Sequence, residues 1–136
     1  MEDSRTPKRS VTAPIAIGEL IDKISILEIK AARFVDGAQL RNVEAELRLL
    51  NQIKSAAGLE TPDMKPFADE LTKLNTKLWD FENEIRAHEA QHDFGEEFIA
   101  LARKVYLTND QRAHVKHQIN LRYGSDIVEE KSYSGR

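Results

Sequence analysis

Cysteine is absent from this 136-residue chain, and no apolar run approaches the roughly 18–20 residues that a membrane span requires. Without cysteine the chain cannot form a disulfide, a thiolate metal site or a cysteine nucleophile. The phosphate-binding motif G-x-x-x-x-G-K-[ST], the dinucleotide motif G-x-G-x-x-G and the nucleophile motif G-x-S-x-G are also missing. These absences exclude the most recognisable nucleotide-binding and hydrolytic site types.

An excess of one charge is lacking as well. Twenty basic and 23 acidic residues leave a net charge of −3, so no bulk field attracts nucleic acid or an anionic membrane. No basic stripe interleaved with aromatic residues is present, which argues against nucleic-acid binding. Residues 1–14 are polar and lack the apolar region of a signal peptide. We therefore expect a cytoplasmic protein with a short disordered arm over residues 1–14.

Four segments carry helical periodicity, and none shows the alternation of a strand. The first begins at Ile17 and runs to about Val35, after which Gly37 is placed where a left-handed helix cap would lie. The second runs from about Leu40 to Ala57 and ends at Gly58. Its apolar positions recur at helical spacing, so both segments are predicted to be amphipathic helices.

The third segment has the most regular pattern. After "LETPD" it tolerates Pro66 in its first turn, and its apolar residues alternate steps of four and three, as in a heptad seam. They are Phe67, Leu71, Leu74, Leu78, Phe81 and Ile85. A fourth helix starts near Gly95. It either continues to Tyr123 or restarts at Thr108, whose spacing to Gln111 fits a capping box, and the pattern leaves both alternatives open.

These lengths predict an all-α fold of two antiparallel helical hairpins, the second longer, over residues 15–123. Residues 124–136 form a tail that Ile127, Val128 and Tyr133 are expected to fold partly back onto the helices. Because the second hairpin overhangs the first, part of its seam needs another cover, and a homodimer would supply one. Ile26 and Ile29 lie off the main apolar stripe of the first helix and also lack a predicted neighbour.

One short stretch spells a metal motif. Residues 88–92 read His-Glu-Ala-Gln-His, and two histidines four apart on a helix can bind zinc while Glu89 acts as a base. However, His88 and His92 continue the heptad spacing from Ile85, so helix packing already accounts for them. Phe98 occupies the place of a third histidine. Zinc at His88 and His92 is therefore the less favoured interpretation, and no other cofactor is predicted.

A polar seam is the better candidate site. In the fourth helix, polar residues take over an angular position that Phe98, Ala102 and Val105 hold earlier. An antiparallel hairpin would bring them opposite polar residues of the third helix. Glu28 lies within the apolar stripe of the first helix, and we expect this buried carboxylate to meet Arg112 or Lys116. The candidate ligand-binding residues are Glu28, Asn75, Trp79, Asn109, Arg112, Lys116 and Asn120, and Glu82 and Arg86 lie along the same edge.

Four strings make the chain resemble a known bacterial family. They are "IGELIDKISILEIKAARF", "LNTKLWDFENEIR", "DFGEEFIALARKVYLTNDQR" and "IVEEKSY", which together span about residues 15–133. The family they resemble is a domain of unknown function, number 6165. The resemblance implies a small cytoplasmic helical protein. It also implies relatives encoded near genes for cell-surface glycan synthesis, which favours a sugar-phosphate ligand.

Three functions follow from these patterns. In the first, the chain is a binding or interaction module, with ion pairs that set helix register. In the second, it is a ligand-binding accessory or enzyme of cell-surface glycan metabolism, and Arg112 and Lys116 bind the phosphate of a sugar nucleotide. In the third, it is a zinc-dependent hydrolase that uses the histidine motif. A homodimer and a separate protein partner are both compatible with the first function.

Overall fold

The computed structural model describes residues 6–132, and within that range all regular secondary structure is helical. Two shorter helices, α1 (Ile17–Arg33) and α2 (Gly37–Ala56), precede two longer ones, α3 (Met64–Ala90) and α4 (Glu96–Tyr123). The all-α prediction and the pairing of helix lengths are confirmed. Residues 1–5 of the predicted N-terminal arm and Tyr133 of the tail lie outside the described residues.

The helix ends correct two details of the sequence prediction. α1 ends at Arg33, so Val35 lies outside the helix and is 96% exposed. Gly37 is not a left-handed cap but the first residue of α2, because Asp36 caps that helix by accepting a hydrogen bond from the Gln39 amide at 2.9 Å. The left-handed glycines are Gly58 after α2, as predicted, and Gly124 after α4.

The open question about the fourth helix is answered in favour of one continuous helix. α4 has 28 residues and passes through Thr108 without a break. Thr108 is buried in the helix interior, and no capping hydrogen bond involves its side chain. An uninterrupted α4 carries Arg112 and Lys116 as a rigid pair of side chains one turn apart.

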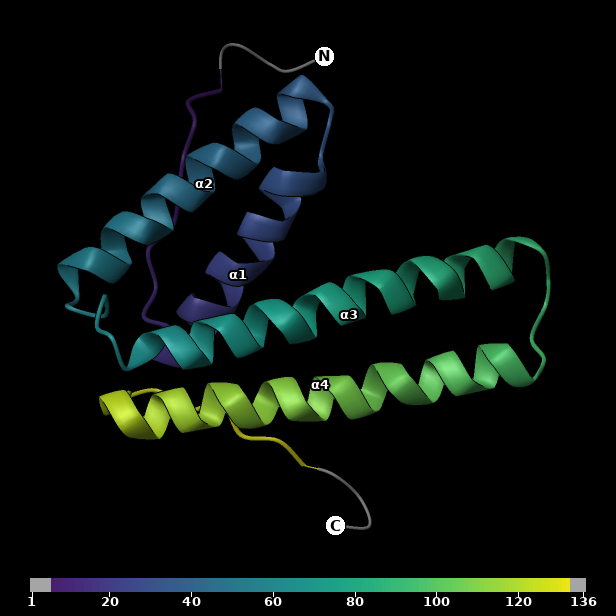
Figure 1. Cartoon of the computed structure of the whole chain (residues 1–136). Coiled ribbons are helices and arrows are strands. Elements are labelled where there is room, and N and C mark those ends of the chain that lie inside the picture. Colours follow the sequence, from purple (N-terminus) through teal and green to yellow (C-terminus); the bar gives the residue numbers. More distant parts are fainter. Residues whose placement is uncertain (1–5, 133–136) are drawn as a thin grey trace.

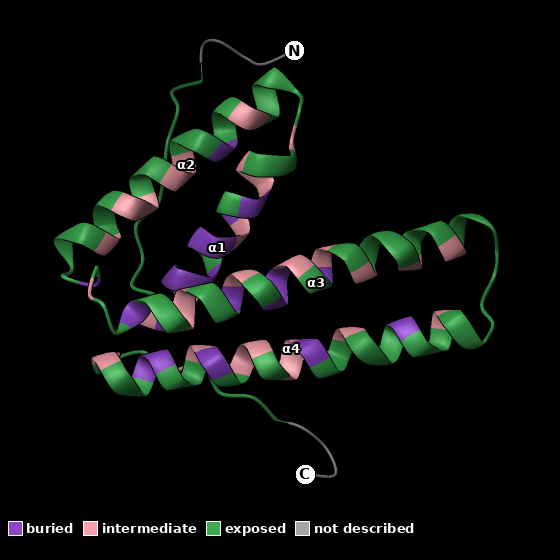
Figure 2. Ribbon diagram, in the orientation of Figure 1, coloured by how far each residue is buried: buried purple, intermediate pink, exposed green. Residues whose placement is uncertain are grey.

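α1 is the central element of the fold. It packs against each of the other three helices, whereas α2 packs along α1 only. The arrangement is thus two hairpins with α1 lying on the α3–α4 pair and α2 on its outer side, rather than a closed bundle (Figure 1). The halves of α3 and α4 that lead to their connecting loop extend past α1. Figure 2 shows mostly exposed residues there.

The core lies where α1 meets the other half of α3 and α4. Its fully buried members include Ile21 of α1, Leu71 and Leu74 of α3 and Ile119 of α4. Burying each such side chain contributes about 1.5–3 kcal/mol to stability. No helix within residues 6–132 is long and apolar enough to span a bilayer.

One glycine sets the contact between α1 and α4. A Cβ atom built on Gly18 would lie 2.4 Å from the carbonyl oxygen of Lys116, far inside van der Waals contact. The Gly18 amide donates to Asn120 Oδ1 at 2.7 Å, and the Ile17 amide donates to Ser125 Oγ at 3.1 Å. These bonds satisfy two of the free N–H groups at the start of α1 and hold that end against α4. The positions of the next α1 side chains over α4 are thereby determined.

Candidate functional site

Asp22 is the buried carboxylate at the centre of the polar contacts. It is 2% exposed and projects from α1 towards α3 and α4. Asn75 Nδ2 donates to Asp22 Oδ1 and to Ser25 Oγ, both at 2.8 Å. The Ser25 hydroxyl donates to the Asp22 carbonyl at 2.6 Å. Within residues 6–132 no buried side-chain nitrogen or oxygen lacks a hydrogen-bond partner, so the cost of burying these groups is offset.

Two cations from α4 approach this acid. Arg112 donates from Nη1 to Asn75 Oδ1 at 3.0 Å, and its Nε lies 4.0 Å from Asp22 Oδ2. Lys116 Nζ lies 3.7 Å from the same oxygen. A buried carboxylate of α1 therefore does meet Arg112 and Lys116, as predicted, but that carboxylate is Asp22.

Glu28 is not that carboxylate. It is exposed, and no ion pair joins it to Arg112 or Lys116 in the described part of the chain. The six residues between Asp22 and Glu28 turn the helix by about 600°, which leaves the two side chains about 120° apart. Because Gly18 brings the N-terminal half of α1 closest to α4, the acid that meets the cations comes from that half.

Lys116 is surrounded by carboxylates. Its Nζ is 2.5 Å from Glu19 Oε2 and 3.3 Å from Glu129 Oε2, and its side chain is 12% exposed. Burial by itself lowers the pKa of this ammonium group. The hydrogen bond to Glu19 and the charges of Asp22, Glu19 and Glu129 outweigh burial, so the pKa of Lys116 is raised above its usual 10.5. Lys116 is thus neutralised by protein groups.

Asn120 has a structural role that the sequence did not indicate. It is 3% exposed, and its Oδ1 caps α1 at Gly18. Asn120, Glu19 and Lys116 also line a hollow of about 20 Å³, which is large enough for a water molecule only. A shallower hollow of about 370 Å³ lies between Tyr106, Arg112 and Lys131.

A larger open hollow of about 510 Å³ lies beside Arg112, between α1, α3 and α4. It brings together four of the predicted site residues, Asn75, Trp79, Asn109 and Arg112, along with Glu82 and Arg86 of the same edge. Glu28, Lys116 and Asn120 are not among its lining residues. Its volume falls in the range of about 300–1,000 Å³ that small-molecule sites occupy.

The hollow has an apolar wall that the site prediction missed. Ile26 and Ile29 of α1 and Leu78 and Trp79 of α3 all line it, and Asn83 completes the lining. The sequence did indicate that Ile26 and Ile29 are unusual, because these apolar residues lie off the main apolar stripe of α1 and have no predicted neighbour. Only the crossing of α1 over α3 shows that they line the same space as Arg112.

Trp79 is held in place from the outer side. The Phe34 ring centroid is 6.0 Å from that of Trp79, and the Arg33 guanidinium carbon lies 5.7 Å from the indole centroid. Arg33 is itself fixed by an ion pair with Asp80 at 2.9 Å. These contacts order the indole before any ligand binds, which reduces the entropy cost of stacking on it.

Arg112 and Arg86 supply the positive charge of the hollow. Arg112 uses one nitrogen on Asn75 and directs Nε towards Asp22, so Nη2 keeps hydrogen-bond donors for a ligand. Arg86 is exposed, and no ion pair holds it within residues 6–132. Guanidinium groups recognise carboxylates and phosphates through paired N–H donors. The arrangement is suited to an anionic group next to an apolar or ring-bearing one.

The histidine motif does not form a zinc-binding helix face. α3 ends at Ala90, and His92 lies beyond it with a left-handed φ of 53°. His88 Nδ1 instead contacts Asp93 Oδ2 at 3.1 Å, and its Nε2 lies 3.6 Å from Glu97 Oε2. No group of three or more histidine or acidic side chains in the described residues has the geometry to hold a metal ion. The helical spacing on which the zinc interpretation depends is therefore lost.

These features define a small all-α protein with a polar cluster and an adjoining hollow at the junction of its two hairpins. The chain belongs to a family of unknown function, DUF6165, whose model matches residues 11–136. The resemblance identified from the four sequence strings is thereby confirmed. No curated protein and no solved structure matches the chain.

Proposed function

We propose that this protein is a binding module for a small anionic ligand that also carries a sugar or an aromatic ring. The observation that supports this most is the hollow of about 510 Å³ in which Arg112 and Arg86 lie beside Trp79. Phosphate or carboxylate oxygens would accept from the two guanidinium groups. A ring would stack on Trp79, and Asn83, Asn109 and the Glu82 carboxylate would hydrogen-bond to hydroxyl groups.

The ligand class proposed is a sugar phosphate or sugar nucleotide, and the setting proposed is cell-surface glycan metabolism in a bacterial cytoplasm. In support, two guanidinium groups line the hollow, and the contacts of Arg112 with Asn75 and Asp22 use Nη1 and Nε, which leaves the Nη2 donors for an anionic group. Lys116 contributes to the fold of the site rather than to the ligand, because Glu19, Asp22 and Glu129 already neutralise it.

The test uses the single tryptophan as reporter. UDP-glucose, UMP and inorganic phosphate are titrated while the fluorescence of Trp79 and the melting temperature are recorded. A ligand at one hundred times its dissociation constant adds about 2.7 kcal/mol, or on the order of 8 °C for a chain of this size. UDP-glucose is expected to change both signals. No change with any of these compounds at millimolar concentration would contradict the proposal.

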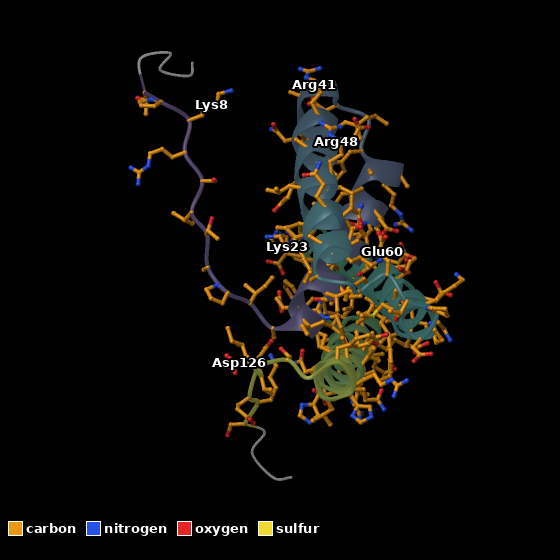
Figure 3. All side chains as sticks on the ribbon, turned by 90° about the vertical axis from the view of Figure 1, so that its left-hand side faces the viewer. Lys8, Lys23, Arg41, Arg48, Glu60 and Asp126 are labelled. Atoms are coloured by element: carbon orange, nitrogen blue, oxygen red, sulfur yellow. The ribbon has the colours of Figure 1, made fainter. Side chains whose placement is uncertain are left out.

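A matched pair of variants locates the site. Arg86→Ala removes an exposed side chain that lines the hollow, and a lost charge-assisted hydrogen bond of about 1.5–2 kcal/mol weakens binding by roughly tenfold or more. Stability is expected to stay unchanged because no ion pair is broken. Arg48→Ala is the control, since Arg48 lies on the α1–α2 hairpin away from α4 (Figure 3). Equal affinity of both variants would place the ligand elsewhere.

We also propose that the protein works as a homodimer, as its sequence predicts. The parts of α3 and α4 beyond α1 support this, because they form only one layer of helix. There Phe81, Ile85, Phe98 and Val105 are only half-buried, and Phe94 is 50% exposed. Two helices alone do not bury such a seam, so another chain is needed to cover it.

A further inference from the structure

Two hollows of the molecule share part of their lining. Asn109 and Arg112 line both the hollow of about 510 Å³ beside Trp79, here called the inner hollow, and the one of about 370 Å³, here called the outer hollow. The inner hollow opens towards α1 and α3, and the outer one towards the tail, where Lys131 lines it. Each volume lies in the range of about 300–1,000 Å³ that small-molecule sites occupy. The two hollows are therefore neighbours across one edge of α4.

Arg112 is fixed at the boundary between the hollows. Its Nη1 donates to Asn75 Oδ1 at 3.0 Å, and its Nε lies 4.0 Å from Asp22 Oδ2. Both contacts come from inside the fold, so Nη2 keeps its donors for a ligand. Because the guanidinium group is ordered before a ligand arrives, less entropy is lost on binding. An anionic group on Arg112 would lie where a ligand passes from one hollow into the other.

Lys131 brings a second cation to the outer hollow. The described part of the tail runs back along α4 (Figure 1), and Glu129 Oε2 lies 3.3 Å from Lys116 Nζ. Glu129 Oε1 contacts Lys131 Nζ at 2.6 Å, so one carboxylate ties both lysines together. The Lys131 side chain is 47% exposed, and its pair with Glu129 uses one of three ammonium donors. The other donors remain for a phosphate group.

Tyr106 supplies an aromatic ring to the outer hollow. It is 52% exposed and lies about 9 Å along α4 from Arg112. Nucleobases stack on exposed aromatic side chains whatever their sequence, because every base has a flat π-face. Asp110 also lines this hollow, but it already interacts within the chain, so we assign it no part in binding. The outer hollow thus offers a stacking ring and a cation.

We propose that the two hollows form one site for a nucleoside diphosphate sugar, with the sugar on Trp79, the diphosphate on Arg112 and Lys131, and the base on Tyr106. The ligand has the order ring, anion, ring, and the side chains follow the same order across α4. A sugar phosphate would fill the inner hollow only and leave Tyr106 without a contact. This inference rests on the proposed function, because both use the inner hollow.

Two half-ligands test whether both hollows are used. UDP-glucose, UMP and glucose 1-phosphate are titrated by calorimetry to obtain three dissociation constants. UDP-glucose joins the two halves covalently and is expected to bind more than about tenfold tighter than either half. If UDP-glucose binds no more tightly than the better half-ligand, only one hollow is occupied and the inference is overturned.

Two variants locate the two ends of the ligand. Tyr106→Ala removes the stacking ring and is expected to weaken the binding of UDP-glucose and UMP roughly fivefold or more, without changing that of glucose 1-phosphate. Arg86→Ala is expected to weaken UDP-glucose and glucose 1-phosphate but not UMP. Leu107→Ala is the control for Tyr106→Ala, because Leu107 is the next residue of α4, is 48% exposed and lines neither hollow. Equal affinity of Tyr106→Ala and Leu107→Ala for UDP-glucose overturns the inference.

The same titrations separate this inference from the proposed function. If UDP-glucose and glucose 1-phosphate bind equally tightly and Arg86→Ala weakens both, the inner hollow is a ligand site and only the two-hollow arrangement is refuted. If Arg86→Ala weakens UMP and Tyr106→Ala does not, the base lies in the inner hollow, and the proposed orientation is wrong. A chain that binds none of the three compounds refutes both proposals.

Discussion

Replacing Gly18 by alanine tests the packing that positions the site. An added Cβ would lie 2.4 Å from the Lys116 carbonyl oxygen and 3.0 Å from the Lys116 carbonyl carbon and Cα. Ordinary contact begins at 3.4 Å, so the α1 and α4 backbones must separate by about 1 Å. The obstacle is main chain, which cannot rotate aside as a side chain would.

Three energies decide the outcome. Overpacking of this kind costs about 1–3 kcal/mol. The same separation stretches the 2.7 Å bond from Gly18 to Asn120 beyond hydrogen-bonding distance, which adds about 1–3 kcal/mol for an unpaired buried amide. Alanine is the better helix former by at most about 1 kcal/mol. The first two effects exceed the third, and the expected net loss of stability is about 2–4 kcal/mol.

Urea denaturation followed by helical circular dichroism measures this loss. At about 3 °C per kcal/mol, the melting temperature should fall by roughly 6–12 °C. Gly37→Ala is the matched control, because its Cβ would meet only the flexible Arg41 guanidinium at 3.4 Å. That variant should be as stable as the wild type or slightly more stable. If the Gly18→Ala protein is as stable as the Gly37→Ala protein, the close packing of α1 on α4 is refuted.

Three further predictions concern the polar cluster. Asp22→Ala should cost about 1–3 kcal/mol, because it removes the buried carboxylate from Asn75 and Lys116 while Asn75 keeps Ser25 and Lys116 keeps Glu19. Glu28→Ala should change stability by less than about 0.5 kcal/mol. Similar losses would contradict the exchange of roles between these acids. The hydrogen bond from Lys131 and the charge of Lys116 lower the pKa of Glu129 below 4.5, so this stabilisation is present above pH 4.5 and lost as pH falls further. When the denaturation midpoint is measured at a series of pH values, Glu129→Gln should show a smaller fall of the midpoint below pH 4.5 than the wild type does. Because the pKa of Lys116 is raised, its contribution is present below pH 10.5 and lost as pH rises through the folded value, and Lys116→Met should abolish that alkaline loss.

Much of the site could be predicted because helical spacing places residues on faces. The positions of Asn75, Trp79, Asn109 and Arg112 follow from two long helices and a short loop, and all four line the hollow. The assignment of the buried acid to Glu28 was wrong because the apolar stripe of α1 shows which face is buried but not where along its length α4 crosses. That crossing depends on Gly18, whose close contact with Lys116 no one-dimensional pattern displays.

The histidine motif likewise shows that residue spacing can be read from the sequence while the end of a helix cannot. Its spacing is a property of the sequence, but a shared helix face requires that the helix continue to His92. α3 ends two residues earlier, because the chain must turn into α4, and His92 adopts a left-handed backbone instead.

By itself, the sequence determined the all-α class, the order of two shorter and two longer helices, the cap at Gly58 and the family, because these depend on local spacing and on residues near one another in the chain. Only the tertiary structure decided which acid pairs with Arg112 and Lys116, that Asn120 caps α1, and that Ile26 and Ile29 form a wall of the hollow. Each of these depends on the angle and height at which two helices cross. Those quantities arise from side-chain packing between segments about 50 to 100 residues apart.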